Sequence, residues 1–133
     1  MHQVRPIVLV RDWSDNESVT LLDFPENVSM IVVLAAIELN PGTRERFLIE
    51  FRQLVPLVRA ETGCLEYFPA IDFPSEMPVQ GPQRHDFVIV VEKWTNIEAL
   101  QAHLVAPHMV AYRPKVKDFV KKVHLQIMEP AAE

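Results

Sequence analysis

The chain has 133 residues, a net charge of −5 and a pI of about 5.5, with 49% hydrophobic and 23% charged residues. This length and composition are typical of one compact globular domain. The acidic balance argues against a nucleic-acid-binding protein, because no basic stripe is available to neutralise phosphates.

The single cysteine, Cys64, excludes an internal disulfide and an all-cysteine metal site, and it suits a reducing compartment. No apolar run approaches the roughly 20 residues that span a bilayer. The apolar run PIVLV near the N-terminus is too short for a secretory signal. We therefore expect a soluble, cytoplasmic protein without a nucleic-acid or membrane partner.

Residues 1–28 differ from the rest of the chain and are interpreted as an N-terminal extension. Within it, PIVLV favours a short strand, added at the edge of a sheet, whereas RDWSDNES and DFPEN are typical of turns. The regular domain is expected over residues 29–133. It opens with SMIVVLAAIEL, an almost continuous apolar run that indicates a strand covered on both faces.

A helix is predicted to follow this strand. Thr43 is its expected N-cap, Pro56 should kink it, and Gly63 is its expected C-cap. Apolar residues recur at helical spacing along it and should form its buried stripe: Phe47, Leu48, Phe51, Leu54, Val55 and Val58.

Two strands should come next, joined by a long loop with the sequence DFPSEMPVQGPQRH. In CLEYFPAID, alternation places Leu65 and Tyr67 on one face and Cys64 on the other. In DFVIVVEKW, alternation places one set of residues on a single face: Val88, Val90, Glu92 and Trp94.

The pattern TNIE predicts a capping box, with Thr95 as N-cap and Glu98 reaching back to it. The helix IEALQAHL should end before Pro107, and a further helical stretch should follow until Pro114 breaks or kinks it. KKVHLQIM is the last predicted strand, with Val123, Leu125 and Ile127 facing inward.

The predicted order is β-α-β-β-α-β, which is the ferredoxin-like arrangement of the α+β class with an antiparallel sheet. Its helices cover one face of the sheet. The other face is too apolar for water, so we expect two sheets to pack together in a homodimer.

Two segments carry a resemblance to a known family. The run GCLEYFPAID, which follows VRAETG, and the run VVEKWTNIEALQAHLVAPHMVAY resemble the antibiotic biosynthesis monooxygenase family, which includes quinol monooxygenases. The likeness covers roughly residues 29–128. It implies a dimeric α/β-barrel that oxidises a small phenolic or quinol compound with O2 and without flavin, haem or metal. The run MIVVLAAIEL lacks the asparagine of the haem-degrading branch.

The two histidines of the second run raise the question of a metal site. His103 and His108 are five positions apart, which is about 140° around a helix, and Pro107 intervenes. Metal-binding pairs on a helix share one face, and we see no third ligand nearby. No metal is therefore expected.

His103 and Trp94 are the candidate catalytic residues. His103 lies at the margin of an apolar helical stripe, where it could remove a phenolic proton, or be held by a backbone carbonyl as a structural residue. Trp94 could stack on an aromatic substrate, or be a core residue. The candidate substrate-binding residues are Tyr67, Tyr112, Glu92 and His108, and the tyrosine hydroxyls could orient a substrate oxygen. The last three also have a structural interpretation: Tyr112 in the core, Glu92 bonded at the strand–helix junction, and His108 beside a helix start.

The first functional hypothesis is thus a cofactor-independent monooxygenase of a small aromatic substrate. Two alternatives remain: a non-catalytic dimeric barrel that binds a small ligand or serves a stress response, and an isomerase of a small metabolite. The family resemblance predicts the fold more firmly than it predicts the reaction.

Overall fold

The computed structural model describes residues 4–12, 15–25 and 30–132. Its helices and strands follow in this order: β1 (Val4–Asp12), β2 (Asp15–Pro25), β3 (Ile31–Leu39), α1 (Arg44–Arg59), β4 (Cys64–Ala70), β5 (Phe87–Trp94), α2 (Ile97–Leu104), α3 (Pro107–Val116) and β6 (Val120–Met128).

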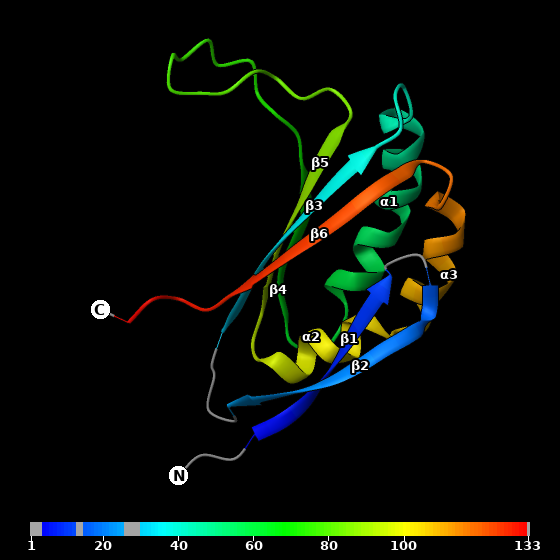
Figure 1. Ribbon diagram of the computed structural model, residues 1–133, viewed down its shortest axis with the longest axis vertical. Coiled ribbons are helices and arrows are strands. Elements are labelled where there is room, and N and C mark those ends of the chain that lie inside the picture. The colour runs from blue at the N-terminus through cyan, green and yellow to red at the C-terminus, as the bar shows by residue number, and fades with distance from the viewer. Residues whose placement is uncertain (1–3, 13–14, 26–29, 133) are drawn as a thin grey trace.

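The main sheet has four strands in the order β4-β5-β3-β6, and every neighbouring pair is antiparallel. The helices α1, α2 and α3 all lie on one side of this sheet (Figure 1). From β3 onward the order is β-α-β-β-α-β with the second helix divided in two, so the predicted ferredoxin-like fold is confirmed. Within the described residues, none of the helices is long and apolar enough to cross a membrane.

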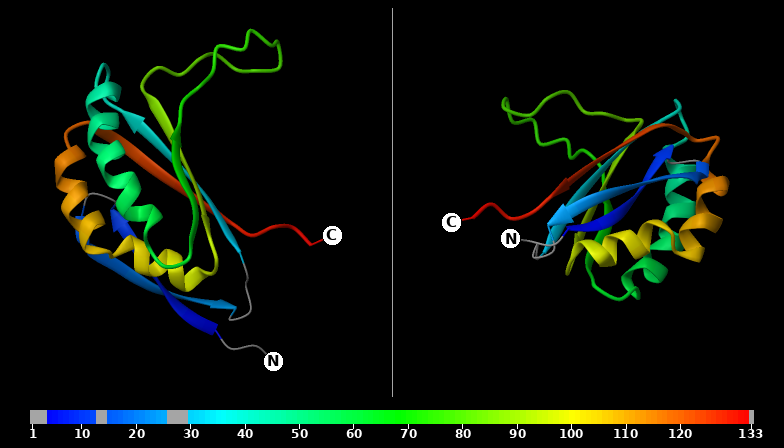
Figure 2. Two further views of the ribbon diagram at one scale, coloured as in Figure 1. Left: turned by 180° about the vertical axis from the view of Figure 1, so that it is seen from behind. Right: turned by 60° about the horizontal axis from the view of Figure 1, so that its bottom comes forward.

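The N-terminal segment differs from its prediction. β1 pairs with β2 in a separate two-stranded sheet, and neither strand joins the edge of the main sheet. The segment expected to be turn material is largely strand, since β2 runs from Asp15 to Pro25. Pairing β1 with the neighbouring β2 closes a shorter loop than pairing β1 with a strand of the main sheet would close. The hairpin therefore costs less chain entropy. The hairpin lies at the α2 end of the molecule (Figures 1 and 2).

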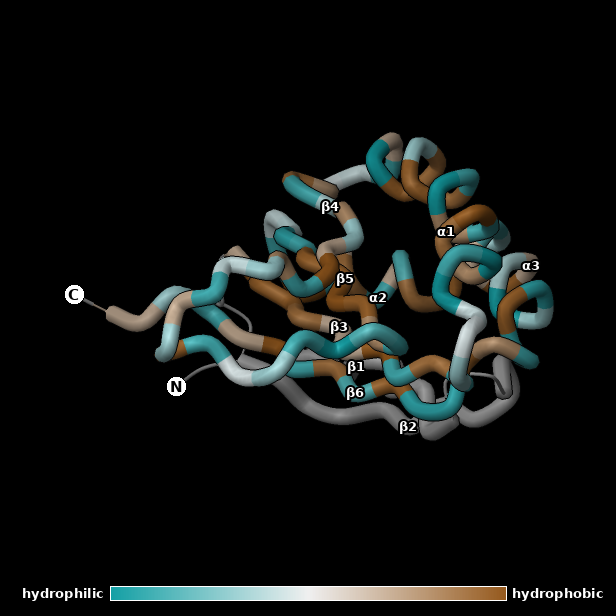
Figure 3. The backbone as a smooth tube through the Cα atoms, turned by 90° about the horizontal axis from the view of Figure 1, so that it is seen from above, coloured by the Kyte–Doolittle hydropathy of each residue, from teal (hydrophilic) through white to brown (hydrophobic). Residues whose placement is uncertain are grey.

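The core lies between the helices and the sheet. Alternate residues of β3 are buried, beginning with Ile31 and Val33, whereas Leu34 on the other face is 37% exposed. The expectation that this strand is covered on both faces is therefore wrong for the single chain. On the helix side, all six predicted stripe residues of α1 are buried. Hydrophobic and hydrophilic segments alternate around the turns of α1 (Figure 3).

α1 begins and ends differently from the expected capping pattern. Thr43 is the N-cap residue, but its hydroxyl donates to the carbonyl of Asn40 at 2.7 Å instead of capping the helix. Pro56 lies inside the last turn of α1, which continues through it to Arg59 with the loss of the one backbone hydrogen bond that the proline nitrogen cannot donate. The C-cap is Ala60, and Gly63 belongs to the turn that leads into β4.

α2 is capped one residue later than predicted. Asn96 is the N-cap, and its side-chain oxygen accepts a hydrogen bond from the amide of Ala99 at 2.9 Å. α3 begins at Pro107, a position where a missing amide hydrogen costs nothing. Pro114 is contained in α3, which continues to Val116.

A shift in strand register changes the faces of β4. Cys64 pairs with Trp94 and Glu66 with Lys93, so one extra residue is inserted between the two pairs. As a result Tyr67 is buried, Cys64 packs against the core, and Leu65 is 52% exposed. The predicted strict alternation in this strand is wrong, because the bulge resets it.

The segment between β4 and β5 is the long loop that the sequence predicts. It projects away from the body, at the end opposite the hairpin (Figures 1 and 2). An ion pair closes its base: the Arg84 guanidinium contacts both carboxylate oxygens of Asp72, at 2.7 and 2.9 Å. These bonds from Arg84 lower the pKa of Asp72 to about 2.

Candidate functional site

The candidate site is centred on one carboxylate that holds two histidines. Glu61 lies in the turn between α1 and β4, His103 in the last turn of α2, and His108 in the first turn of α3. Glu61 Oε2 is 2.9 Å from His103 Nδ1 and 2.6 Å from His108 Nε2. Both histidines therefore contact the same carboxylate oxygen.

Burial and hydrogen bonding act in opposite directions on Glu61. Burial raises its pKa, but the hydrogen bonds and electrostatic interactions with His103 and His108 outweigh burial, so the pKa of Glu61 lies below its ordinary value. The side chain of Glu61 is 12% exposed, that of His103 2% and that of His108 24%. His103 is thus shielded from solvent, whereas His108 is partly exposed at the surface.

Gly63 explains how the turn that carries Glu61 comes so close to α2. Its φ is +84°, and a Cβ atom there would lie 2.6 Å from Thr95 Oγ1 and 2.7 Å from the Cβ of Ala99. Its carbonyl accepts a hydrogen bond from the amide of Thr95 at 2.8 Å. Only glycine permits both this backbone angle and this approach. This hydrogen bond and the close packing against Ala99 therefore hold the α1–β4 turn against the start of α2.

Aromatic rings surround His103. The Trp94 ring lies tilted against it with 4.7 Å between centroids, and the Tyr67 ring meets it edge-on at 5.4 Å. Tyr67 in turn stacks on Phe51 of α1, at 5.6 Å. The imidazole is held by a carboxylate on one nitrogen and by aromatic rings around its plane.

Glu92 is a buried carboxylate next to this group. It is 5% exposed and accepts a hydrogen bond from the indole Nε1 of Trp94 at 3.0 Å. Burial raises the pKa of Glu92, while the His103 charge and the Trp94 hydrogen bond partly offset this effect. The indole N–H of Trp94 is thus engaged by Glu92.

The second tyrosine lies farther from the histidines. Tyr112 of α3 is 8% exposed, and its ring meets Phe51 edge-on at 6.1 Å. Burial raises the pKa of Tyr67 and that of Tyr112 well above the ordinary value for tyrosine, so both hydroxyls stay protonated at neutral pH. Buried Arg113 follows, and its guanidinium donates to the carbonyl of Leu104 at 2.7 Å, joining α3 to the end of α2.

The structure brings together five of the six residues singled out in the sequence: His103, Trp94, Tyr67, Glu92 and His108. Tyr112 is connected to them through Phe51. His103 is paired with a carboxylate, not with the backbone carbonyl that the structural reading supposed. Whether any of these residues acts on a substrate stays a prediction.

Sequence reasoning missed Glu61. It lies within the quoted VRAETG run, but no spacing rule connects it to residues 42 and 47 positions away. His103 and His108 do not face apart as their spacing suggested, because they belong to separate helices, α2 and α3, and Glu61 supplies a third potential ligand atom beside them.

Comparisons with known proteins agree with this fold. The family model described as "Antibiotic biosynthesis monooxygenase" matches residues 30–115. The chain is 36% identical over 103 residues to the Escherichia coli (strain K12) protein named "Probable quinol monooxygenase YgiN", covering 76% of this chain and 98% of that one. The chain belongs to the antibiotic biosynthesis monooxygenase family.

Solved structures show the same architecture. PA3566 from Pseudomonas aeruginosa has a TM-score of 0.65 at 24% identity, covering 78% of this chain and 96% of that one. Rv0793 from Mycobacterium tuberculosis has a TM-score of 0.64 at 22% identity, with 79% and 98% covered. At these identities the likeness establishes the fold alone.

Proposed function

We propose that the protein is a monooxygenase that oxidises a small phenolic or quinol compound with O2, with His103 as the base. The observation that carries this proposal is the environment of His103, which is 2% exposed, bonded to Glu61 through Nδ1 and enclosed by the rings of Trp94 and Tyr67. The name of the Escherichia coli relative supports a quinol substrate.

In this proposal Glu61 orients the ring of His103 and sets which of its two nitrogens carries the proton. A carboxylate that accepts from Nδ1 selects the tautomer whose other nitrogen, Nε2, carries a lone pair. That nitrogen takes the proton from the substrate hydroxyl. Glu61 is therefore a positioning residue, and Trp94 and Tyr67 offer the aromatic surface against which a flat substrate packs.

The reaction balances without a further reductant. Loss of a proton makes the quinol electron-rich enough to pass electrons to O2. One oxygen atom then enters the ring and the other leaves as water, so that a hydroquinone and O2 give a hydroxyquinone and water. The chain's own residues are required only to bind, deprotonate and shield the substrate. We propose that no cofactor takes part.

The proposal includes a homodimer formed through the open face of the sheet. Cross-strand partners lie on the same face of a sheet, and Leu34 and Phe68 are both paired with Val91. Leu34 and Phe68 are each 37% exposed, and the Lys93–Glu66 ion pair lies beside them. An apolar centre with a charged margin is typical of a protein interface.

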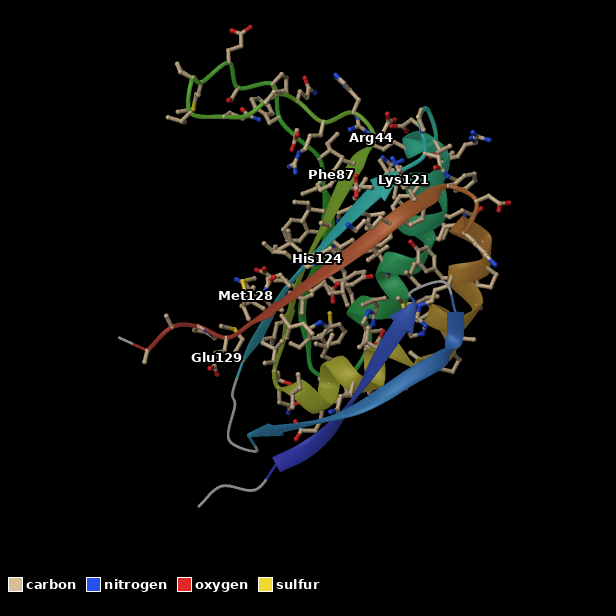
Figure 4. The ribbon with its side chains drawn as sticks, viewed as in Figure 1. Arg44, Phe87, Lys121, His124, Met128 and Glu129 are labelled. Carbon is tan, nitrogen blue, oxygen red and sulfur yellow. The ribbon has the colours of Figure 1, made fainter. Side chains whose placement is uncertain are left out.

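Oxygen consumption by the chelator-treated protein tests the proposed activity. A panel of hydroquinones and anthrols is supplied, and the His103→Ala variant is compared with wild type and with His85→Ala. His85 is exposed in the loop that leads into β5, two residues before Phe87, which Figure 4 labels. We expect turnover that falls about 100-fold or more in His103→Ala and is unchanged in His85→Ala. If wild type binds these compounds but consumes no O2, the protein is a ligand-binding barrel and the proposal is wrong.

A further inference from the structure

We propose that Glu61, His103 and His108 together bind one divalent transition-metal ion, for which Zn²⁺ is the probe. The three side chains each offer one ligand atom, and these atoms all lie within 4.8 Å of one another. They come from three separate segments: the α1–β4 turn, α2 and α3.

The donor set suits such an ion. Two imidazole nitrogens and one carboxylate oxygen form a common three-residue set for Zn²⁺ and for other first-row transition metals. The protein supplies three ligands, which leaves a fourth position for water or a small molecule. Because His108 is 24% exposed and Glu61 12%, an ion can reach the cluster from this side without opening the core.

The geometry needs only local adjustment. Bonds from Zn²⁺ to nitrogen and oxygen are about 2.0–2.2 Å long, which separates tetrahedral ligand atoms by about 3.3 Å. The 2.9 and 2.6 Å contacts to Glu61 must therefore lengthen slightly as the ion enters between the three atoms. The partly exposed side chains of Glu61 and His108 can make this shift, while His103 is held by Trp94 and Tyr67.

The surrounding fold keeps the ligands in place before an ion arrives. The Gly63 carbonyl is bonded to Thr95, which fixes the turn of Glu61 against α2. The Arg113 guanidinium joins α3 to the end of α2 and so holds His108 near His103. Ligands arranged in advance lower the entropic cost of binding.

Binding has a consequence that rests on the proposed function. A metal on Nδ1 of His103 leaves the neutral imidazole with its proton on Nε2, so this nitrogen can no longer accept a proton from a substrate. The ion is thus an inhibitor that occupies the base, and its removal restores turnover.

Direct binding measurements test the site independently of activity. The 133-residue chain is freed of metal with a chelator and titrated with Zn²⁺ by calorimetry, and Co²⁺ is added separately to record its visible absorption. Wild type, His108→Ala and Glu61→Gln are compared with His85→Ala as the control for surface histidines.

We expect one Zn²⁺ per chain in wild type and in His85→Ala. The affinity should fall about 100-fold or more in His108→Ala, because a direct ligand matters at least as much as the groups around it. The Co²⁺ spectrum should also change in this variant. Absence of one-to-one binding in wild type, or binding that survives His108→Ala unchanged, would overturn the proposal.

Turnover is then measured in wild type with saturating Zn²⁺ and again after chelation. Reversible loss of turnover supports inhibition, whereas full activity with the ion bound refutes the inhibitory role. If no quinol is turned over at all, the proposed function fails, but the calorimetric result still decides whether the metal site exists.

Discussion

Glu61 Oε2 lies 2.9 Å from Nδ1 of His103, although 42 positions separate the two residues in the chain. The contact joins the turn after α1 to the end of α2. The same oxygen also contacts His108 at the start of α3, so one carboxylate connects the α1–β4 turn, α2 and α3. Glu61 is therefore expected to matter for stability as well as for the orientation of His103.

Glu61→Ala should destabilise the fold by about 1–3 kcal/mol, because the almost fully buried His103 loses the acceptor for Nδ1. Glu61→Gln should cost less, since its amide oxygen still accepts one hydrogen bond. Urea unfolding of the two variants measures this difference. Equal stability of wild type and Glu61→Ala would contradict the role given to this contact.

The same pair of variants separates positioning from folding. With Glu61→Gln still folded, kcat should fall about 10-fold or more while KM changes little, because a neutral amide stabilises the protonated imidazole formed during catalysis less well than a carboxylate does. Steady-state oxygen consumption gives both constants. A rise in KM at constant kcat would instead place Glu61 in substrate binding.

Glu92 should make stability depend on pH. Its folded-state pKa is raised above the ordinary value of 4.5, mainly by burial, so the folded protein holds this proton more tightly than the unfolded chain does. The associated stability is present below pH 4.5 and is lost as pH rises through the raised pKa. Glu92→Gln removes this loss while its amide oxygen still accepts from Trp94.

We therefore expect Glu92→Gln to be more stable than wild type at pH 7, on the order of 1 kcal/mol, and to lose this advantage near pH 4. Unfolding free energies of both proteins across this range provide the measurement. An advantage that is constant with pH would show that Glu92 has the same pKa in the folded and unfolded states.

Gly63→Ala should destabilise the protein more than Gly42→Ala does. Both glycines have a positive φ, +84° and +76°, so alanine is strained at either position by about 1–2 kcal/mol. A Cβ at Gly42 meets nothing within 4 Å, whereas at Gly63 it collides with Thr95 and Ala99. Thermal unfolding of both variants isolates the cost of the collision. Equal losses would mean that the close approach to α2 is unimportant.

The proposed dimer can be tested with two leucines of unlike position. Leu34 lies on the open face of the sheet and is 37% exposed. Leu57 lies on α1, on the opposite side of the molecule, and is 52% exposed. Leu34→Asp should shift the protein to monomer, because a buried charge in an apolar interface is costly. Leu57→Asp should remain dimeric. Light scattering measures the mass, and a wild-type monomer would refute the interface.

The sequence by itself determined the order of the strands and helices from β3 onward and the core residues of α1 and β5. Alternation in β5 correctly placed Val88, Val90, Glu92 and Trp94 on one buried face, and helical spacing correctly found the stripe of α1. These patterns are local, because each depends only on the repeat of one strand or helix. They fail where the repeat is interrupted, as at the bulge between Cys64 and Glu66.

The candidate site was decided by the tertiary structure. Spacing suggested that His103 and His108 face apart, but Pro107 starts a second helix whose direction returns His108 toward α2. The partner of both, Glu61, is identified only when Gly63 brings its turn against Thr95. Contacts between residues distant in sequence depend on how whole elements pack, and no local pattern carries that information. The sequence thus determined which elements form from β3 onward, and only their packing decided which side chains meet.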